Sequence, residues 1–286
     1  MIKILITGVN SYLGNAVEKW LLQEPDKYQI TKISVRDESW KKVDFSQFDV
    51  VYHVASIAHV NAKKNDESLY YKVNRDLTLK VALKAKESQV SQFIFMSSII
   101  VYGETKSLKP IIIDKDTIPQ PNGFYGKSKL EAEEGLQKLS SEDFKIAIIR
   151  PPMIYGANCK GNFPRLVKLS KSIPLFPCFH NQRSMLFVDN LCIFVKKIID
   201  IEANGIFHPQ NDEYSDTVEL MRTLSQIQGH KIIFSKLLIP FVYCASLCIH
   251  SINKVFGTEI YEKDIDVLVS DCSFISLTDS LEKTKI

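Results

Sequence analysis

A tyrosine and a lysine four residues apart, Tyr125 and Lys129, form the pair in this chain with the clearest potential for acid–base chemistry. On a helix this spacing places both side chains on one face, within reach of the same ligand. A phenol has an ordinary pKa of about 10, so it acts near neutrality only where a cation such as Lys129 stabilises its anion. Ser98, at the end of an apolar run, can hydrogen-bond the substrate oxygen that gains or loses the proton.

Chance alone produces tyrosine–lysine pairs at this spacing, so the spacing by itself is not informative. The position of this pair in the chain is what distinguishes it. Tyr125 opens a predicted helix behind a turn that contains proline and glycine, downstream of a strand-like run that ends in Ser97 and Ser98. In sheets of parallel strands, ligands gather at the carboxyl ends of the strands. The order of these elements therefore makes Ser98, Tyr125 and Lys129 the candidate catalytic residues.

A short turn with two glycines follows the first apolar run, within Thr7–Gly14 (TGVNSYLG). It lies where a dinucleotide-binding unit brings main-chain N–H groups and a helix N-terminus to a pyrophosphate. A serine replaces the usual middle glycine; it is small, and its hydroxyl can donate to a phosphate. The turn therefore predicts a dinucleotide site formed by Gly8, Asn10, Ser11, Tyr12, Leu13 and Gly14.

The end of the second predicted strand bears on which dinucleotide binds. NAD-binding proteins place an acid there for the ribose 2′-hydroxyl, whereas an arginine accommodates a 2′-phosphate. This strand ends in Val35, Arg36 and Asp37, with the arginine first after the apolar run. The sequence therefore favours NADP over NAD as the cofactor.

Strand-like apolar runs alternate with helical periodicity in the part of the chain before residue 210. The predicted strands are 2–6, 30–35, 50–54, 93–96, 146–149 and 186–188, and the predicted helices are 15–23, 67–87, 126–139 and 190–201. The strands are continuous apolar runs and not alternating ones, so both faces of the sheet should be covered by helices. This pattern predicts an α/β fold, a Rossmann-type doubly wound parallel sheet.

Prolines interrupt this rhythm after Arg150, which indicates a second, smaller lobe. We expect residues 1–152 plus about 186–205 to form the NAD(P)-binding Rossmann domain. Residues 153–185 plus 206–286 should then form a C-terminal substrate-binding lobe.

The composition argues against several other classes. The 36 Lys and Arg nearly balance 33 Asp and Glu, and a net charge of +3 is too small to predict nucleic-acid binding. The six cysteines show no CxxC pair and no metal-ligand spacing, so we expect no metal and reduced thiols, as in a cytoplasmic protein. The apolar stretch 237–253 is shorter than the roughly 20 residues of a membrane span. It predicts no integral membrane segment but a buried helix, with peripheral membrane contact as the alternative.

Taken together, the ordered motifs of the chain resemble the extended short-chain dehydrogenase/reductase family, of the NAD-dependent epimerase/dehydratase type that modifies nucleotide sugars. The resemblance covers roughly residues 1–210. The motifs that carry it are Thr7–Gly14, Asp49–Ser56 (DVVYHVAS), Val73–Asp76 (VNRD), Ser97–Gly103 (SSIIVYG), Tyr125–Lys129 (YGKSK), Arg150–Gly156 (RPPMIYG) and Arg183–Asn190 (RSMLFVDN).

The resemblance implies a role for each matching residue. Tyr125 is the catalytic acid and base, Lys129 holds the nicotinamide ribose and lowers the pKa of the tyrosine, and Ser98 contacts the substrate oxygen. The implied cofactor contacts are Asp44 and Phe45 near the adenine, then Val54, Ala55, Ser56, Asn74, Pro151 and Ile154. The implied substrate contacts are Ser98, Met153, Asn162 and Arg183, the last of these to the nucleotide diphosphate. The resemblance also implies a nucleotide-sugar substrate and a homodimer formed through the helices at 67–87 and 126–139.

The reaction is narrowed by the two residues after Ser98. In dehydratases of the family an aspartate and a glutamate stand there, whereas this chain has Ile99 and Ile100, so dehydration is not expected. The favoured interpretation is a 4-keto reductase of a UDP-linked hexose, 6-deoxy-hexose or hexosamine. The alternative is a UDP-hexose 4-epimerase that keeps its NAD tightly bound, and a third is a non-catalytic NADP-binding sensor or structural protein.

Overall fold

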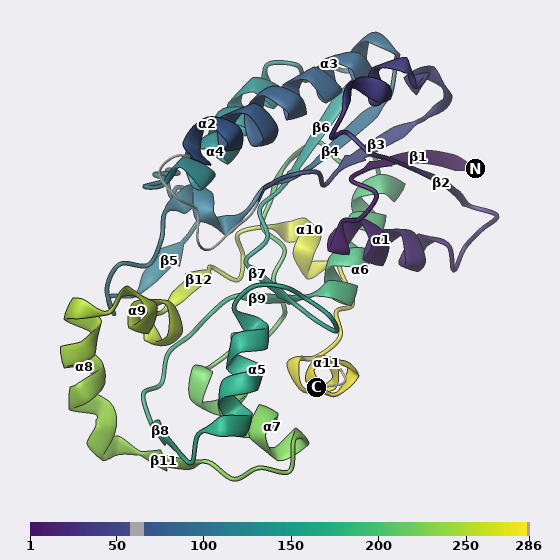
Figure 1. The fold of residues 1–286 in the computed structure, drawn as a ribbon. Helices are drawn as coiled ribbons and strands as arrows, with labels where there is room; N and C mark the ends of the chain where they lie inside the picture. Colours follow the sequence, from purple (N-terminus) through teal and green to yellow (C-terminus); the bar gives the residue numbers. More distant parts are fainter. Residues whose placement is uncertain (58–65, 285–286) are drawn as a thin grey trace. The chain divides into compact units, whose positions relative to one another are not determined.

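The computed structural model describes residues 1–57 and 66–284, which fold into two compact units (Figure 1). Unit 1 comprises Met1–Gly103, Pro119–Pro151 and Val188–Pro209, and unit 2 comprises Glu104–Ile118, Pro152–Phe187 and Gln210–Ile286. The sequence interpretation assigned Glu104–Ile118 to the first domain. The structure places it in unit 2, because β5 (Ile111–Ile113) pairs with β12 (Glu259–Tyr261) far along the chain.

The described part of unit 1 is built on a six-stranded parallel sheet in the order β10-β6-β4-β3-β1-β2. The strands are β1 (Ile2–Thr7), β2 (Tyr28–Ile33), β3 (Val50–His53), β4 (Gln92–Met96), β6 (Lys145–Ile149) and β10 (Gly205–Phe207). β2 lies on one side of β1, and β3, β4, β6 and β10 follow in chain order on the other side. This arrangement confirms the predicted doubly wound α/β fold.

Helices cover both faces of this sheet. One layer holds α1 (Tyr12–Leu21) and α6 (Val188–Asp200), which contact each other; the other holds α2 (Glu67–Tyr70), α3 (Thr78–Glu87) and α4 (Phe124–Gln137) (Figure 1). A π-helix, Tyr71–Leu77, joins α2 to α3. Two short 3₁₀-helices, Glu38–Lys42 and Phe45–Gln47, lie between β2 and β3. Another, Ile99–Tyr102, follows β4.

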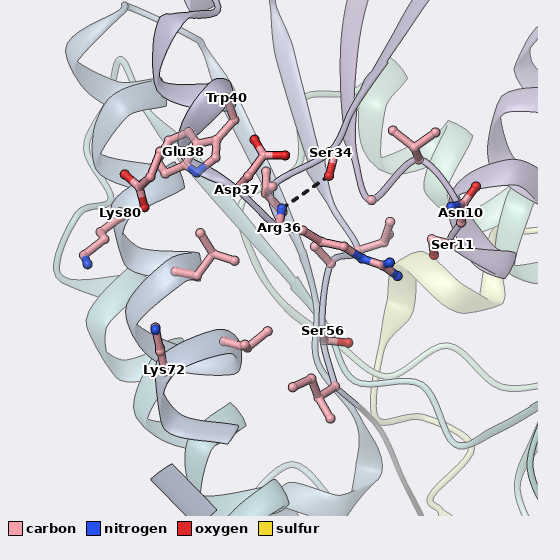
Figure 2. A pocket seen from close by; sticks show the side chains of 18 of the residues that line it. Asn10, Ser11, Ser34, Arg36, Asp37, Glu38, Trp40, Ser56, Lys72 and Lys80 are labelled. Atoms are coloured by element: carbon pink, nitrogen blue, oxygen red, sulfur yellow. Dashed lines mark hydrogen bonds between the residues drawn. The ribbon is translucent and has the colours of Figure 1, made fainter. Parts of the chain in front are cut away.

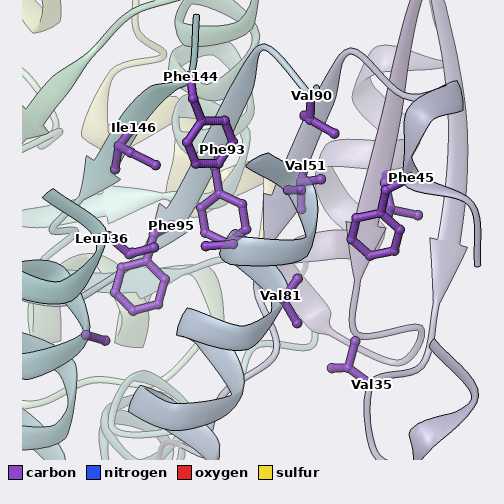
Figure 3. Packing of buried hydrophobic residues seen from close by; sticks show 14 of the residues in the cluster. Val35, Phe45, Val51, Val81, Val90, Phe93, Phe95, Leu136, Phe144 and Ile146 are labelled. Carbon is purple, nitrogen blue, oxygen red and sulfur yellow. The ribbon is translucent and has the colours of Figure 1, made fainter. Parts of the chain in front are cut away.

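The core of unit 1 lies between the sheet and the layer of α3 and α4. Every residue of β4 is buried, and Phe93 and Phe95 pack with Val81 of α3 and Leu136 of α4 (Figure 3). Full burial of one such side chain contributes about 1.5–3 kcal/mol. The continuous apolar strands of the sequence are thus explained by a sheet that is covered on both sides.

A buried histidine joins strands β1 and β3 to helix α3. His53 Nδ1 lies 2.8 Å from the Thr7 hydroxyl, and its Nε2 lies 3.0 Å from the Thr78 hydroxyl. Burial, together with the charge of Lys129, lowers the pKa of His53 to about 3. The ring is therefore neutral and acts as a bridge at the carboxyl ends of the strands.

Unit 2 contains small two-stranded sheets and several helices. Its other strand pairs in the described residues are β7 (Met153–Tyr155) with β9 (Met185–Phe187) and β8 (Leu175–Pro177) with β11 (Ile233–Ser235). Its helices are α5 (Phe163–Ser172), α7 (Thr217–Ile227), α8 (Ile239–Cys248), α9 (His250–Phe256), α10 (Val267–Ser270) and α11 (Leu277–Lys283). Phe176, Met221, Val242 and Phe256 form the centre of one apolar cluster.

Two predictions about this unit are wrong. The run 186–188 does not return to the first sheet, because β9 pairs with β7 and the return begins at Val188. The stretch 237–253 is not a buried helix: it forms α8 and most of α9, and Val242 is the buried residue of α8. Across ranges 1–57 and 66–284, we find no helix with the length and apolar character that crossing a membrane requires.

Candidate active site

The glycine turn after β1 packs helix α1 closely against the sheet. Gly8 has φ +99°, a conformation that favours glycine, and a Cβ atom there would lie 3.5 Å from the main chain of Ala55. A Cβ atom on Gly14 would lie 3.1 Å from Ile6 Cγ2 and 3.2 Å from Val54 Cγ2. Ser11 caps α1 by accepting a hydrogen bond from the Gly14 N–H at 3.2 Å. The first turn of α1 carries no acidic residue, so no side-chain charge there opposes an anion at the N-terminus of the helix.

A cavity of about 790 Å³ opens beside this turn, at the carboxyl ends of β1, β2 and β3 (Figure 2). Its walls come from the glycine turn, the segment after β2, the segment after β3 and the π-helix with α3. The structure brings together here seven of the predicted cofactor contacts: Gly8, Asn10, Ser11, Arg36, Val54, Ala55 and Ser56.

The cavity is more basic than acidic. Among the described residues that line it, Arg36, Lys41, Lys72 and Lys80 are basic and Asp37 and Glu38 are acidic. Arg36 is exposed, and its guanidinium points toward the side of the cavity that carries Asn10 and Ser11 (Figure 2). The Asp37 carboxylate accepts a hydrogen bond from the Ser39 N–H at 2.9 Å, and bonding to Ser39 lowers the pKa of this carboxyl group. These charges fit an anionic ligand with phosphate groups.

Several predicted cofactor contacts lie outside the cavity lining that the described residues form. Phe45 is fully buried in the core of unit 1, and the Asp44 carboxylate caps the 3₁₀-helix that follows it. Tyr12, Leu13 and Gly14 begin helix α1, where Gly14 is buried. Pro151 is also buried, and its carbonyl accepts a hydrogen bond from the Ile99 N–H at 2.9 Å.

Asn74 has a positioning role in this structure. It is fully buried in the π-helix; its Oδ1 accepts from the Ile57 N–H at 2.8 Å, and its Nδ2 donates to the Ile57 carbonyl at 3.1 Å. The same amide donates to the Ser128 hydroxyl at 3.2 Å. Asn74 therefore ties the segment after β3, which lines the cavity, to the helix that carries Tyr125 and Lys129.

The structure brings Ser98 and Tyr125 together. Ser98 begins the 3₁₀-helix after β4, and Tyr125 lies in the first turn of α4 and is half-buried. Burial raises the pKa of Tyr125 to about 12, while a side-chain hydrogen bond with Ser98 acts in the opposite direction. The phenol is thus neutral at pH 7 until further positive charge comes close to it.

Lys129 is buried one turn further along α4. Its Nζ donates a hydrogen bond to the Met96 carbonyl at 2.6 Å and lies 4.5 Å from the centre of the Phe95 ring. Burial lowers the pKa of Lys129 to about 7, and the charge of Glu133 opposes this shift. The lysine is therefore poised between its charged and neutral forms near pH 7.

Sequence reasoning missed a buried network behind Lys129. Glu133 accepts hydrogen bonds from the Ser97 hydroxyl and from Arg150, whose Nη2 lies 2.5 Å from Glu133 Oε2. Arg150 Nη1 also donates to the Tyr102 hydroxyl at 2.7 Å, and that hydroxyl lies 2.8 Å from His208 Nε2. The sequence signal that could have revealed part of this network is the spacing of Glu133, which lies four residues after Lys129 and therefore on the same face of the helix.

The predicted substrate contacts other than Ser98 lie in unit 2. Met153 is on β7 with Ile154, and Asn162 is an exposed residue that precedes α5. Arg183 pairs with Glu259 at 3.0 Å and donates to the carbonyls of Lys254 at 2.8 Å and Gly257 at 3.2 Å. Its guanidinium thus holds β12 and the end of α9, and its contact with a diphosphate stays a prediction.

Comparisons with known proteins agree with this geometry. A family model described as the NAD dependent epimerase/dehydratase family matches residues 4–207. The UDP-glucose 4-epimerase of Vibrio cholerae is 34% identical over 248 residues, which cover 78% of this chain and 74% of that protein. The N-acetyl-α-D-glucosaminyl-diphospho-ditrans,octacis-undecaprenol 4-epimerase of Escherichia coli O157:H7 is 28% identical, covering 89% of this chain and 81% of that protein.

Solved structures show the same fold. The UDP-N-acetylglucosamine 4-epimerase of Bacillus cereus gives a TM-score of 0.76 at 17% identity and covers 100% of this chain and 98% of its own. A dTDP-4-dehydrorhamnose reductase of Clostridium acetobutylicum gives 0.65 at 21% identity, over 82% of this chain and 83% of its own. The chain therefore belongs to the NAD-dependent epimerase/dehydratase family, as the resemblance predicted, and is an NAD(P)-dependent enzyme of the extended short-chain dehydrogenase/reductase type.

Proposed function

We propose that the protein is a 4-epimerase of a nucleotide-linked hexose. The observation that carries this proposal is its 34% identity to the UDP-glucose 4-epimerase of Vibrio cholerae over 78% of the chain. The relative from Escherichia coli O157:H7, whose name gives it as a 4-epimerase of an undecaprenol-linked sugar, supports the same type of reaction. The relatives thus favour the epimerase over the 4-keto reductase that the sequence interpretation preferred.

The cavity of unit 1 fits a dinucleotide. The N-terminus of α1 with Gly8, Asn10 and Ser11 would hold the diphosphate, and Arg36 would lie near the adenosine ribose. The absence of a side chain at Gly14 lets α1 pack closely against Ile6 and Val54, which places the N-terminus of this helix beside the cavity. The chemistry that a bound nicotinamide dinucleotide would supply here is reversible hydride transfer with the sugar carbon, on which inversion at that carbon depends.

The side chains of unit 1 would handle the proton. The Tyr125 Oη would take the proton of the sugar hydroxyl as the carbonyl forms and give it back when the alcohol is restored. A phenol with a pKa of about 12 needs nearby positive charge for this task, and the ammonium of Lys129, four residues further along the same helix, would supply it. Ser98, at the carboxyl end of β4, would orient the phenol through a side-chain hydrogen bond. Ile99 and Ile100 supply no acid or base, so elimination of water is not supported.

The test separates an epimerase from a reductase. We expect purified protein to retain a dinucleotide through dialysis and to interconvert UDP-glucose and UDP-galactose without net consumption of NADH or NADPH. Tyr125→Phe should bind the dinucleotide and lose the interconversion. Consumption of one NADPH for each 4-keto sugar, without any interconversion, would instead establish the reductase.

A polyprenyl-diphosphate-linked sugar is the second candidate substrate. The Escherichia coli O157:H7 relative is, by its name, a 4-epimerase of such a molecule, and α8 of unit 2 exposes an unusual number of apolar side chains. Parallel assays with UDP-N-acetylglucosamine and with its undecaprenyl-diphosphate counterpart decide between the two substrates. Homodimer formation through the helices at 67–87 and 126–139, and a cytoplasmic location, stay predictions.

A further inference from the structure

An apolar surface covers one side of unit 2. We define the α8 surface by its exposed members: Ile233, Leu237, Phe241, Tyr243, Leu247 and Ile249. The side chains of Leu237 and Leu247 are 84% and 87% exposed, and Phe241 is 69% exposed. Single exposed apolar residues are ordinary, but a contiguous set marks a surface that meets another molecule or a membrane.

The helix packs by one side and presents the other. Val242 lies in the apolar cluster with Phe176 and Phe256. Tyr243 meets Phe179 with their ring centres 5.5 Å apart but stays 56% exposed. Phe241, Cys244 and Cys248 are three and four residues apart, so they share a face, and each is exposed. The exposed side of α8 is therefore apolar along its whole length and is not the usual polar face of a surface helix.

The charged residues that flank α8 in the sequence, Lys231 and Lys236 before it and Lys254 after it, are all basic. The sequence from Leu237 to Ile249 has no charged residue, and no Asp or Glu occurs between Leu220 and Thr258. Lys231, Lys236 and His250 flank the apolar stretch and are exposed. One carboxylate, that of Glu104, lies 3.3 Å from His250 Nε2 and also pairs with Lys254. Lysines beside apolar side chains are the arrangement that contacts anionic headgroups above an acyl layer.

The length of α8 decides whether the helix could cross a bilayer or only lie on its surface. Helix α8 has 10 residues and is therefore about 15 Å long, half the thickness of a bilayer's hydrocarbon core. We infer that the α8 surface docks on an anionic phospholipid bilayer, with the helix in the plane of the interface and Lys231 and Lys236 at the headgroups. This inference does not depend on which sugar the enzyme epimerises.

The test uses flotation of the full chain with lipid vesicles. We expect binding to vesicles of phosphatidylglycerol and phosphatidylethanolamine, and much weaker binding to pure phosphatidylcholine. Leu237→Gln/Leu247→Gln should lower the partition coefficient at least about tenfold. Lys231→Gln/Lys236→Gln should lower it roughly thirtyfold on the anionic vesicles. The matched control is Ile118→Gln/Val267→Gln, two residues of unit 2 that are 74% and 78% exposed, and it should bind as the wild type does.

Three outcomes would overturn the inference. The first is a wild type that does not float with the vesicles, and the second is a control variant that loses as much binding as the α8 variant. The third is a self-association in sedimentation velocity that only Leu237→Gln/Leu247→Gln abolishes, which would assign the surface to a second copy. Activity on a water-soluble nucleotide sugar should be the same in all these variants. A failure of membrane binding is therefore distinguishable from a failure of the proposed reaction.

Discussion

The ammonium group of Lys129 donates a hydrogen bond to the main-chain carbonyl of Met96, 2.6 Å away. Met96 ends strand β4 two residues before Ser98, and Lys129 lies one turn after Tyr125 on α4. One hydrogen bond thus fixes the strand that carries the serine to the helix that carries the tyrosine. The two elements are far apart in sequence, so their relative position depends on such buried contacts.

The pKa of Lys129 should depend on Glu133. Glu133→Gln removes the carboxylate that favours the ammonium, so the pKa of Lys129 should fall further below its value of about 7. Chemical shifts of ¹³Cε-labelled lysine as a function of pH measure this value directly. Glu134→Gln is the matched control, since Glu134 is the exposed neighbour on α4. An unchanged Lys129 titration in Glu133→Gln would contradict the assignment.

Replacement of Tyr125 by phenylalanine should lower turnover strongly without unfolding the protein. Proton transfer by a positioned side chain contributes about 10²–10⁴-fold to a rate, so kcat should fall by that factor. Ser98→Ala should have a smaller effect, because it removes a hydrogen bond that opposes the rise in the pKa of Tyr125 and leaves the phenol in place. Steady-state assays together with thermal melting check both variants. Full activity in Tyr125→Phe would refute its role as acid and base.

Gly14→Ala should weaken dinucleotide binding. The new methyl group would lie 3.1 Å from Ile6 Cγ2 and 3.2 Å from Val54 Cγ2, so these side chains or helix α1 must give by a few tenths of an ångström. We expect a loss of at least about tenfold in affinity and of about 1–3 kcal/mol in the free energy of unfolding. Gly123→Ala is the control, since no atom lies within 4 Å of a Cβ there. Calorimetric titration with NAD and urea denaturation measure the two quantities.

Arg36 and Asp37 should act in opposite directions on cofactor choice. Arg36→Ala removes a cation from the cavity, so NADP affinity should fall about tenfold more than NAD affinity. Asp37→Asn should raise the affinity for NADP relative to NAD, because it removes a negative charge from the same wall. Dissociation constants for both dinucleotides give the ratio. If neither variant changes that ratio, the 2′-phosphate does not bind beside Arg36.

His53 should make the stability of the protein fall in acid. Its pKa is about 3 in the folded state and about 6.5 when unfolded, so the unfolded state binds more protons between these values. Its contribution is fully present above about pH 6.5 and is lost as the pH falls toward about 3, at up to about 1.4 kcal/mol per pH unit. Urea denaturation from pH 7 to pH 4 measures this slope. His53→Gln, which does not titrate, should have a correspondingly shallower slope; equal slopes would disprove the argument.

Much of unit 1 could be predicted because its signals are local. Strands β1, β3, β4 and β6 are continuous apolar runs, and the structure places each within about two residues of the prediction. The meeting of Ser98 with Tyr125 followed from a general property of parallel sheets, whose strands end on one side.

Unit 2 and the buried network have no such local signal. Strand β5 has three residues and pairs with β12, about 150 positions away, so neither is recognisable alone. The hydrophobicity of α8 is plain in the sequence, but what covers a helix depends on the rest of the fold. For the same reason Phe45, expected near the adenine, lies in the core, and the Glu133–Arg150 pair was not foreseen.

The π-helix at Tyr71–Leu77 has a consequence for changes in chain length. Its hydrogen bonds span five residues where an α-helix spans four, so the segment behaves as a single-residue insertion between α2 and α3. Deleting one residue there would restore a regular α-helix and remove the wide turn on which Asn74 lies. The Asn74 amide would then leave Ile57, and the wall of the cavity after β3 would lose its anchor. This helix is therefore the place in the described part of unit 1 where we expect a change in length to be tolerated least, although it carries none of the reacting groups.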